Sequence, residues 1–252
     1  MKDVVKLIKF LYWDKPIYNK KSRINFKFLD DFQTNVLKAV EEKGFYIADS
    51  FFDKEVVDKM KVDALDFESL ATDSKNHLSF PDFGVDRFLK ADARDCLAPF
   101  FCGYFDTIGK YYLGGHGVRF QSMFERKGGL DKLSSADVSH FDDWRKRFKI
   151  FLYLNDVNDK NCPFVIYENS LGSYNGRRFK EIEYVLGGKS SAYGHLCPNE
   201  ERQLISETNV SKVSLTANSG TVIFVDTRFV HKGTPSVDGS QRLMLGSYYD
   251  IR

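Results

Sequence analysis

Residues 139–157 read SHFDDWRKRFKIFLYLNDV, a histidine–carboxylate triplet followed by a strand-like run. The triplet is His140-Phe141-Asp142, and the largely apolar run covers residues 148–154. Side chains two positions apart on a strand point to the same face, so the His140 imidazole and the Asp142 carboxylate can bind one ion together. A lone HxD triplet occurs by chance in many chains, and it becomes informative only through the residues that follow it.

Two later residues give the triplet its context. His231 stands at the end of a strand predicted over 221–230, where its imidazole can supply a third ligand. Two histidines and one carboxylate on one face of an octahedron form the usual site of non-haem Fe(II) oxygenases, with three positions left for co-substrate and O2. Arg242 follows His231 by eleven residues, and its guanidinium matches a carboxylate at two points. A dicarboxylic keto acid that chelates iron at one end needs such a partner at the other.

Apolar residues have helical spacing in the segments before these motifs and strand-like spacing in the segments around them. Apolar residues repeat at helical intervals before Gly44, a residue that commonly ends a helix. Helices are predicted over 32–43, from Asp53 to Val62 and over 95–113, and strands over 45–48, 118–124, 136–141, 148–154, 164–167, 212–215, 221–225 and 243–249. This order indicates one α+β, mainly β domain over 1–252, with a mostly helical part over 1–113 and a closed or double-sheet core over 114–252.

The segment 170–211 is long, polar and rich in glycine, without a clear strand period. Loops of this length inside a compact domain usually act as lids or binding loops, so this one is predicted to cover the substrate. Within it, Tyr174, Arg177 and Arg178 are candidates for binding an anionic group of the substrate, with solvated charges as the alternative for the arginines. Trp144, just after the metal motif, is a candidate for the rim of the substrate mouth or for a packed surface aromatic.

Composition restricts the function classes. The net charge is +2 with basic and acidic residues interspersed, so no segment is expected to bind nucleic acid. No run reaches the roughly 18 apolar residues of a membrane span, and no transmembrane segment is expected. The four cysteines form no CxxC pair and no disulfide framework, which favours reduced thiols in a cytoplasmic protein. No feature of the sequence indicates an oligomeric state.

Three stretches together resemble the phytanoyl-CoA dioxygenase family of Fe(II)- and 2-oxoglutarate-dependent oxygenases. They are the segment 139–157 quoted above, SGTVIFVDTRFVHKGTPSVDGSQRLMLGSYYD over 219–250, and EEKGFYIADSFFDKEVVDKM over 41–60, where that family has a helix, a strand and a helix. The resemblance implies a double-stranded β-helix of the jelly-roll or cupin kind, with the N-terminal helices packed on it.

The same resemblance implies the cofactors and the reaction. Fe(II) would be bound by His140, Asp142 and His231, and the far carboxylate of 2-oxoglutarate by Arg242, with O2 as the second co-substrate. The expected reaction is hydroxylation of a small molecule, with succinate and CO2 as co-products. Halogenases of this fold lack the carboxylate so that halide can bind iron, and Asp142 therefore favours hydroxylation. The alternatives are the same oxidant used for desaturation, cyclisation or epimerisation, and a jelly-roll binding protein without turnover.

Three residues near these motifs are further candidates for binding the co-substrate. Some members of the family carry a serine two residues after the distal histidine; this chain has Gly233 there, so Thr234 is expected to substitute. Lys149 can assist Arg242 or reach the iron-side carboxylate if its strand face points inward, and an exposed strand lysine is the alternative. Gln121, on the strand before the metal motif, can donate hydrogen bonds to co-substrate or substrate, or simply pack in the strand.

Overall fold

The computed structural model describes residues 2–9, 28–71, 75–81, 84–128, 135–143, 145–171, 182, 186, 194–207 and 209–251. Within these residues the chain is mainly β and forms two antiparallel sheets, a large one in the order β1-β8-β5-β10-β4-β3-β2 and a small one in the order β7-β6-β9. The strands are β1 (Phe45–Ala48), β2 (His77–Phe80), β3 (Val85–Leu89), β4 (Gly117–Lys127), β5 (Phe148–Tyr153), β6 (Phe164–Glu168), β7 (Ser211–Leu215), β8 (Val222–Asp226), β9 (His231–Lys232) and β10 (Arg242–Ile251).

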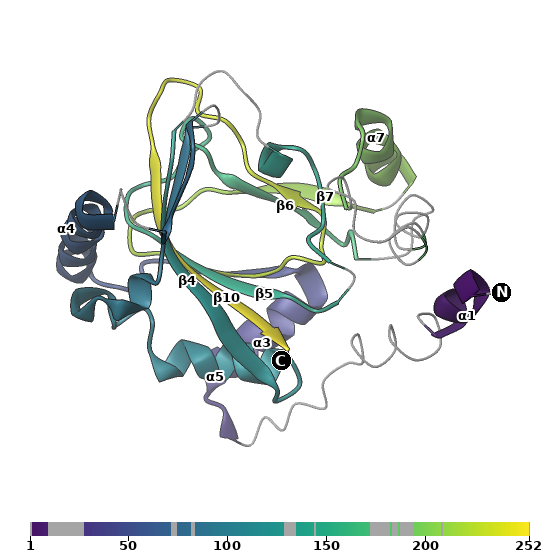
Figure 1. Cartoon of the computed structure of the whole chain (residues 1–252), viewed down its shortest axis with the longest axis horizontal. Helices are drawn as coiled ribbons and strands as arrows, with labels where there is room; N and C mark the ends of the chain where they lie inside the picture. The colour runs from purple at the N-terminus through teal and green to yellow at the C-terminus, as the bar shows by residue number, and fades with distance from the viewer. Residues whose placement is uncertain are drawn as a thin grey trace.

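Three helices pack against the outer face of the large sheet, α3 (Asp31–Lys43), α4 (Lys54–Ala71) and α5 (Gly103–Tyr112) (Figure 1). Helix α3 begins with a capping box at Asp30, whose carboxylate accepts the third backbone N–H of the helix. It ends at Gly44, whose φ of 94° lies in the left-handed region that glycine adopts without strain. The predicted helix 32–43, its glycine end and the strand 45–48 are therefore confirmed.

The inner face of the large sheet turns toward the small sheet and carries the charged side chains of the interior. Because side chains alternate along a strand, the register places them in rows. Arg242 on β10 pairs with Lys127 on β4, and two residues further along, Met244 pairs with Glu125. Glu125 in turn lies opposite Arg87 in the register of β4 and β3. The apolar part of this layer consists of Met123, Phe151, Tyr153, Val157, Ile166, Leu215, Ile223, Val225, Phe229 and Met244.

The N-terminal part contains more strand than the sequence predicts. Strands β2 and β3 form a hairpin that extends the large sheet beyond β4. The helix predicted over 95–113 is divided into a 3-10 turn, η5 (Asp95–Leu97), and α5. Pro99 follows that turn and lacks an N–H to continue the helical hydrogen bonds. Cys102 is extended, with φ −96° and ψ 163°, so α5 begins only after it.

The strand predicted over 136–141 is wrong for most of its length. Its beginning is another 3-10 turn, η6 (Ser135–Asp137), and only His140 forms a bridge with the neighbouring strand β9. The segment 170–211 contains a helix that the sequence did not predict, α7 (Pro198–Glu207). The backbone N–H of Cys197 donates to the Glu200 carboxylate at 2.6 Å, which satisfies a backbone donor at the start of this helix.

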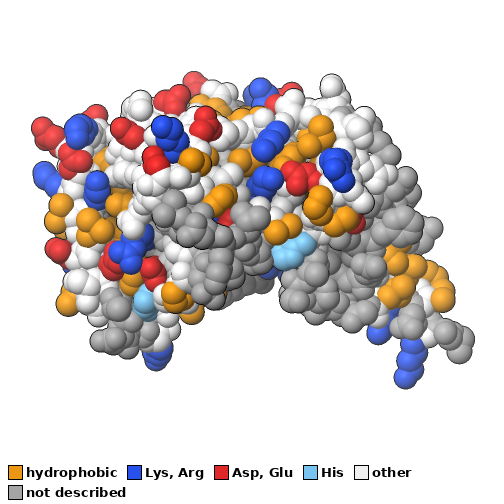
Figure 2. All heavy atoms as spheres, turned by 90° about the horizontal axis from the view of Figure 1, so that it is seen from above, with side chains coloured by type: hydrophobic (Ala, Val, Ile, Leu, Met, Phe, Trp, Pro, Cys, Tyr) orange, Lys and Arg blue, Asp and Glu red, His pale blue; other side chains and the backbone are white. Residues whose placement is uncertain are grey.

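The helices and the surface give three further observations. None of the described helices is long and apolar enough to cross a membrane. On the face shown in Figure 2, basic and acidic side chains are interspersed rather than gathered into one patch. The short helix α1 (Lys2–Lys9) exposes the apolar side chains of Val4, Val5 and Ile8.

Candidate metal centre

The side chains of His140, Asp142 and His231 lie close together, although ninety residues separate the two histidines in the sequence. One donor atom from each lies within 4.8 Å of the other two. The Asp142 Oδ1 atom is 3.7 Å from His140 Nε2 and 3.5 Å from His231 Nε2. The three residues predicted as ligands therefore present their donor atoms to a common point.

Backbone hydrogen bonds fix this arrangement. The His140 N–H donates to the His231 carbonyl at 2.9 Å, and the His231 N–H donates back to the His140 carbonyl at 2.7 Å. The Asp142 N–H donates to the Thr227 carbonyl at 2.9 Å. Phe164 of β6 stacks on the His231 ring with centroids 5.2 Å apart. The donors are thus held by main-chain pairing and packing.

Each histidine also has the tautomer that a metal requires. His140 Nδ1 lies 2.7 Å from the Val138 carbonyl oxygen, and His231 Nδ1 lies 2.9 Å from the Phe229 carbonyl oxygen. A carbonyl oxygen only accepts, so each Nδ1 carries the proton and donates it. In a neutral imidazole this leaves the Nε2 lone pair free, and both Nε2 atoms face Asp142.

Lys149 holds the second oxygen of Asp142. Its Nζ lies 2.6 Å from Asp142 Oδ2, and the tyrosine ring of Tyr248 packs 4.5 Å from the ammonium. Burial by itself would raise the pKa of Asp142, but the Lys149 ammonium holds that pKa well below its usual value. The carboxylate is therefore ionised, with Oδ1 presented to the histidines and Oδ2 bound by the lysine.

Metal-free protein is expected to lose stability as the pH falls below about 6.5. Burial and the neighbouring His231 lower the pKa of His140 to about 3, whereas an unfolded chain takes up that proton near pH 6.5. Because the unfolded state binds the proton first, the free energy of unfolding should fall by about 1.6 kcal/mol between about pH 6.5 and 5.0. Urea unfolding of metal-free protein at the two pH values measures this loss. His140→Gln should remove most of it, and an unchanged pH dependence in that variant contradicts the assignment.

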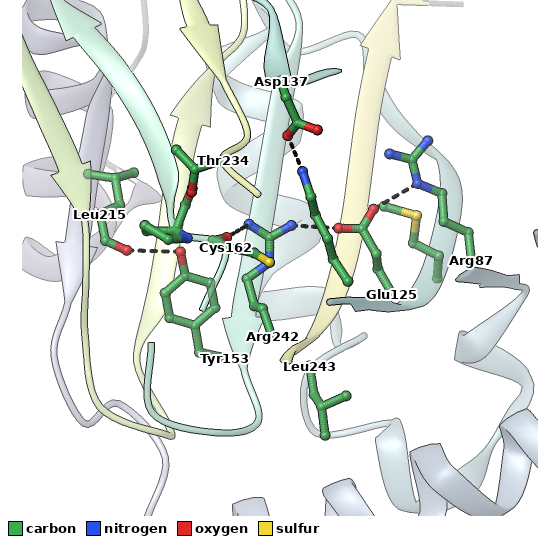
Figure 3. A network of polar contacts seen from close by, with 12 residues as sticks. Arg87, Glu125, Asp137, Tyr153, Cys162, Leu215, Thr234, Arg242 and Leu243 are labelled. Carbon is green, nitrogen blue, oxygen red and sulfur yellow. Dashed lines mark hydrogen bonds and ion pairs between the residues drawn. The ribbon is translucent and has the colours of Figure 1, made fainter. Parts of the chain in front are cut away.

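A cavity of about 340 Å³ extends from the metal ligands toward Arg242. Arg242 is buried, and its Nη1 donates to the Cys162 carbonyl at 2.7 Å while its Nη2 pairs with Glu125 Oε1 at 2.6 Å (Figure 3). Its Nε has no hydrogen-bond partner among the described residues. The cavity is lined by Phe80, Val85, Arg87, Glu125, Lys127, Ala136, His140, Asp142, Lys149, Phe151, Phe164, His231, Gly233, Arg242, Met244 and Tyr248.

Gly233 leaves room for an ion pair beside Arg242. The Lys127 ammonium pairs with the Asp137 carboxylate, and both side chains are buried. A Cβ at Gly233 would meet Asp137 Oδ1 at 2.6 Å and Lys127 Nζ at 2.7 Å. A side chain at position 233 would therefore clash with the Asp137 carboxylate and the Lys127 ammonium. The Thr234 hydroxyl instead donates to the Pro163 carbonyl at 2.9 Å, and the structure does not bring it to the cavity.

The other residues predicted for the site lie in different places. Lys149 faces inward, but it contacts the metal-ligand carboxylate and not Arg242. Gln121 lines a second cavity of about 210 Å³, which shares Asp142, Lys149 and Tyr248 with the first, and its amide contacts Met123 Sδ at 3.6 Å. The remaining candidates lie outside the described residues, and they are Trp144, Tyr174, Arg177 and Arg178.

Sequence reasoning missed three charged residues of the cavity, Arg87, Glu125 and Lys127. A charge within a strand is usually interpreted as solvent-facing. The available signal was the alternation on β4, where Met123, Glu125 and Lys127 share one face. Charges on the same strand face as an apolar residue indicate a polar interior, such as a ligand cavity.

Several solved structures resemble this chain in fold. EctD from S. alaskensis with 2-oxoglutarate and 5-hydroxyectoine aligns with 91% of this chain and 80% of its own, at 14% identity and a TM-score of 0.64. The epimerase SnoN, in complex with Fe3+, alpha ketoglutarate and nogalamycin RO, aligns with 87% of this chain and 84% of its own, at 14% identity and a TM-score of 0.61. AviO1 from Streptomyces viridochromogenes Tue57 covers 86% of this chain and 95% of its own, at 18% identity and a TM-score of 0.58.

No known family profile matches the chain, and no curated protein sequence matches it. At identities of 14–18%, the structural likeness establishes a shared fold. The chemistry of this chain has to be argued from its own residues.

Proposed function

We propose that this protein is an Fe(II)- and 2-oxoglutarate-dependent dioxygenase that hydroxylates a small molecule. The observation that carries the proposal is the set of His140, Asp142 and His231 donor atoms within 4.8 Å, at one end of a cavity that also contains Arg242. Two imidazoles and one carboxylate are the donor set of non-haem Fe(II) oxygenases. EctD and SnoN, which have this fold, were solved with iron or 2-oxoglutarate bound, and this supports the same pair of cofactors here.

Different residues of this chain bind the metal and the co-substrate. Bound at this site, Fe(II) and 2-oxoglutarate supply the activation of O2, with succinate and CO2 formed as one oxygen atom is transferred to the substrate. His140, Asp142 and His231 hold the metal through two Nε2 atoms and one carboxylate oxygen. Arg242 binds the far carboxylate of 2-oxoglutarate through its remaining N–H groups, and the ammonium of Lys127 adds a second positive charge beside it.

The aromatic and apolar lining excludes water from the reacting groups. Phe164 covers the His231 ring, and Phe151 and Met244 line the cavity between the metal ligands and Arg242. Excluding water strengthens each electrostatic contact with the co-substrate and suppresses side reactions. Lys149 keeps the Asp142 carboxylate ionised and oriented, so that one oxygen faces the metal position.

Membership of the phytanoyl-CoA dioxygenase family and a double-stranded β-helix are part of the same proposal. The two facing antiparallel sheets with helices on the outer face of the large one support the fold, and the spacing of eleven residues between His231 and Arg242 supports the family. SnoN is an epimerase and SnoK a carbocyclase, so proteins of this fold use the oxidant in several ways. Asp142 favours hydroxylation over halogenation, and the products distinguish hydroxylation from the other outcomes.

Succinate formation tests the proposal. Purified protein incubated with Fe(II), 2-oxoglutarate, ascorbate and O2 should release succinate slowly even without substrate, and succinate can be quantified by NMR. A chelator added before Fe(II) should abolish the release. Absence of both succinate formation and Fe(II) retention would show that the protein is a binding protein and not an enzyme of this class.

A further inference from the structure

Two arginines in the cavity share a single carboxylate. Glu125 Oε1 pairs with Arg242 Nη2 at 2.6 Å, and Glu125 Oε2 pairs with Arg87 Nε at 2.7 Å (Figure 3). The Glu125 side chain is 3% exposed, and although burial by itself would raise its pKa, the two guanidinium groups lower that pKa to about 2. One negative charge therefore faces two positive charges, and this group of three residues has an excess of one cation.

The other charges of the cavity balance one another. Lys127 pairs with Asp137, and Lys149 pairs with Asp142. Among the described residues of the cavity, the excess positive charge thus belongs to the pair of arginines. The two positive charges of Fe(II) and the two negative charges of 2-oxoglutarate cancel, so the excess persists when both are bound. A buried or half-buried unbalanced cation favours a ligand with a single negative charge.

The two arginines lie at different depths. Arg242 is on β10 in the middle of the large sheet, its side chain is 4% exposed, and Cys162 holds its Nη1. Arg87 is on β3 near the edge of the sheet, and its side chain is 32% exposed. It lies 5.9 Å from the ring of Phe80, which is itself 40% exposed. Arg242 therefore marks the closed end of the cavity and Arg87 its outer part.

Arg87 is positioned to bind a ligand. Its Nε is fixed by Glu125, while its two terminal amino groups make no hydrogen bond with any residue that the structure describes. These amino groups form the fork that binds a carboxylate at two points. The Asp142 carboxylate is close enough to contribute to the raised pKa of Arg87, after the larger effect of Glu125, so the guanidinium faces the same interior as the metal ligands.

We propose that Arg87 binds an anionic group, most simply a carboxylate, of the substrate, and that the substrate is a monoanion with an apolar body. The apolar side chains around the cavity provide the surface for that body, and they are Phe80, Val85, Phe151, Phe164, Met244 and Tyr248. This inference rests on the proposed function, since it assigns Arg242 to the co-substrate and leaves Arg87 for the substrate. Under this proposal the charge of the substrate is selected by Arg87, a residue of β3, which lies outside the sequence motifs.

Matched pairs of probes test the selection of charge. Benzoate and benzamide, phenylacetate and phenylacetamide, and hexanoate and hexanamide differ mainly in charge within each pair. Each is titrated calorimetrically into anaerobic protein loaded with Fe(II) and 2-oxoglutarate. At least one carboxylate should bind about tenfold or more tightly than its amide, and Arg87→Gln should abolish that preference. The same variant should change the Kd of 2-oxoglutarate by less than about threefold.

Two variants control the test. Arg94 is 33% exposed and pairs with Asp63 at 2.7 Å outside the cavity, so Arg94→Gln removes a comparable arginine and should keep the preference. Arg87→Lys retains the charge and should keep part of it. The inference is overturned if no carboxylate binds better than its amide in the unaltered protein. It is also overturned if Arg87→Gln keeps the preference, and a tenfold or greater loss of 2-oxoglutarate binding in that variant then assigns Arg87 to the co-substrate. Failure to bind Fe(II) or 2-oxoglutarate appears before any probe is added and counts against the proposed function instead.

Discussion

Replacing His231 with alanine is expected to abolish Fe(II) retention and succinate formation while leaving the chain folded. The variant removes one of three donors and leaves His140 and Asp142 with one nitrogen and one oxygen. Loss of residues that merely support metal ligands already costs roughly 10–100-fold in metal affinity, and loss of a ligand should cost at least about 100-fold. Metal content after dialysis, together with anaerobic Fe(II) titration, measures the effect.

His77 provides the matched control. Its side chain is 13% exposed, it stacks on Phe88 and pairs with Asp86, and it does not belong to the three donors. His77→Ala should bind Fe(II) as the unaltered protein does. If His231→Ala binds Fe(II) with unchanged affinity, the ligand assignment is refuted; circular dichroism of both variants excludes unfolding as the cause of a loss.

The second large effect is expected for Arg242→Met. This change removes the buried guanidinium in the cavity that we propose binds the far carboxylate of 2-oxoglutarate. Removing one member of a buried charge pair costs about 2–5 kcal/mol, so the Kd of 2-oxoglutarate should rise at least about thirtyfold. Fe(II) affinity should change little, because Arg242 contacts Glu125 and Cys162 and not the metal ligands.

Arg242→Lys separates charge from geometry. It retains a cation for Glu125 but loses the planar fork, so 2-oxoglutarate affinity should fall between that of the unaltered protein and that of Arg242→Met. A large drop in Fe(II) affinity in either variant, with 2-oxoglutarate binding otherwise intact, would assign the arginine to the metal site. Urea unfolding of both variants shows whether the altered partner of Glu125 affects the fold itself.

The elements predicted correctly from the sequence are those whose local residue pattern favours the same structure that the folded protein adopts there. Helix 32–43 ends at Gly44 because glycine adopts the left-handed conformation found there, and the strand 45–48 follows immediately. The central strands β5, β8 and β10 are long apolar runs between turn residues. The grouping of His140, Asp142 and His231 could be predicted for a related reason, since the triplet and the spacing from His231 to Arg242 are both read directly along the chain.

The rest of the site depends on contacts that no local pattern contains. Glu125 meets Arg87 across 38 positions of sequence and Arg242 across 117. The hairpin of β2 and β3 is mostly exposed or half-buried and places the charged Arg87 at the cavity, so its sequence resembles that of an exposed segment. Thr234 was predicted to replace a family serine because Gly233 stands at that position. The side chain that lies beside Gly233 is instead Lys127, which comes from another strand.

The proposed metal and co-substrate site is best tested by anaerobic titration of 2-oxoglutarate into Fe(II)-loaded protein. An α-keto acid that chelates Fe(II) through its carboxylate and keto oxygen gives a visible charge-transfer absorption that neither component has alone. We expect this absorption to saturate at one equivalent of 2-oxoglutarate and to be absent in His231→Ala. Arg242→Met should need at least about thirtyfold more 2-oxoglutarate to reach it. If the absorption of Fe(II)-loaded protein does not change on addition of 2-oxoglutarate, the proposed site is wrong.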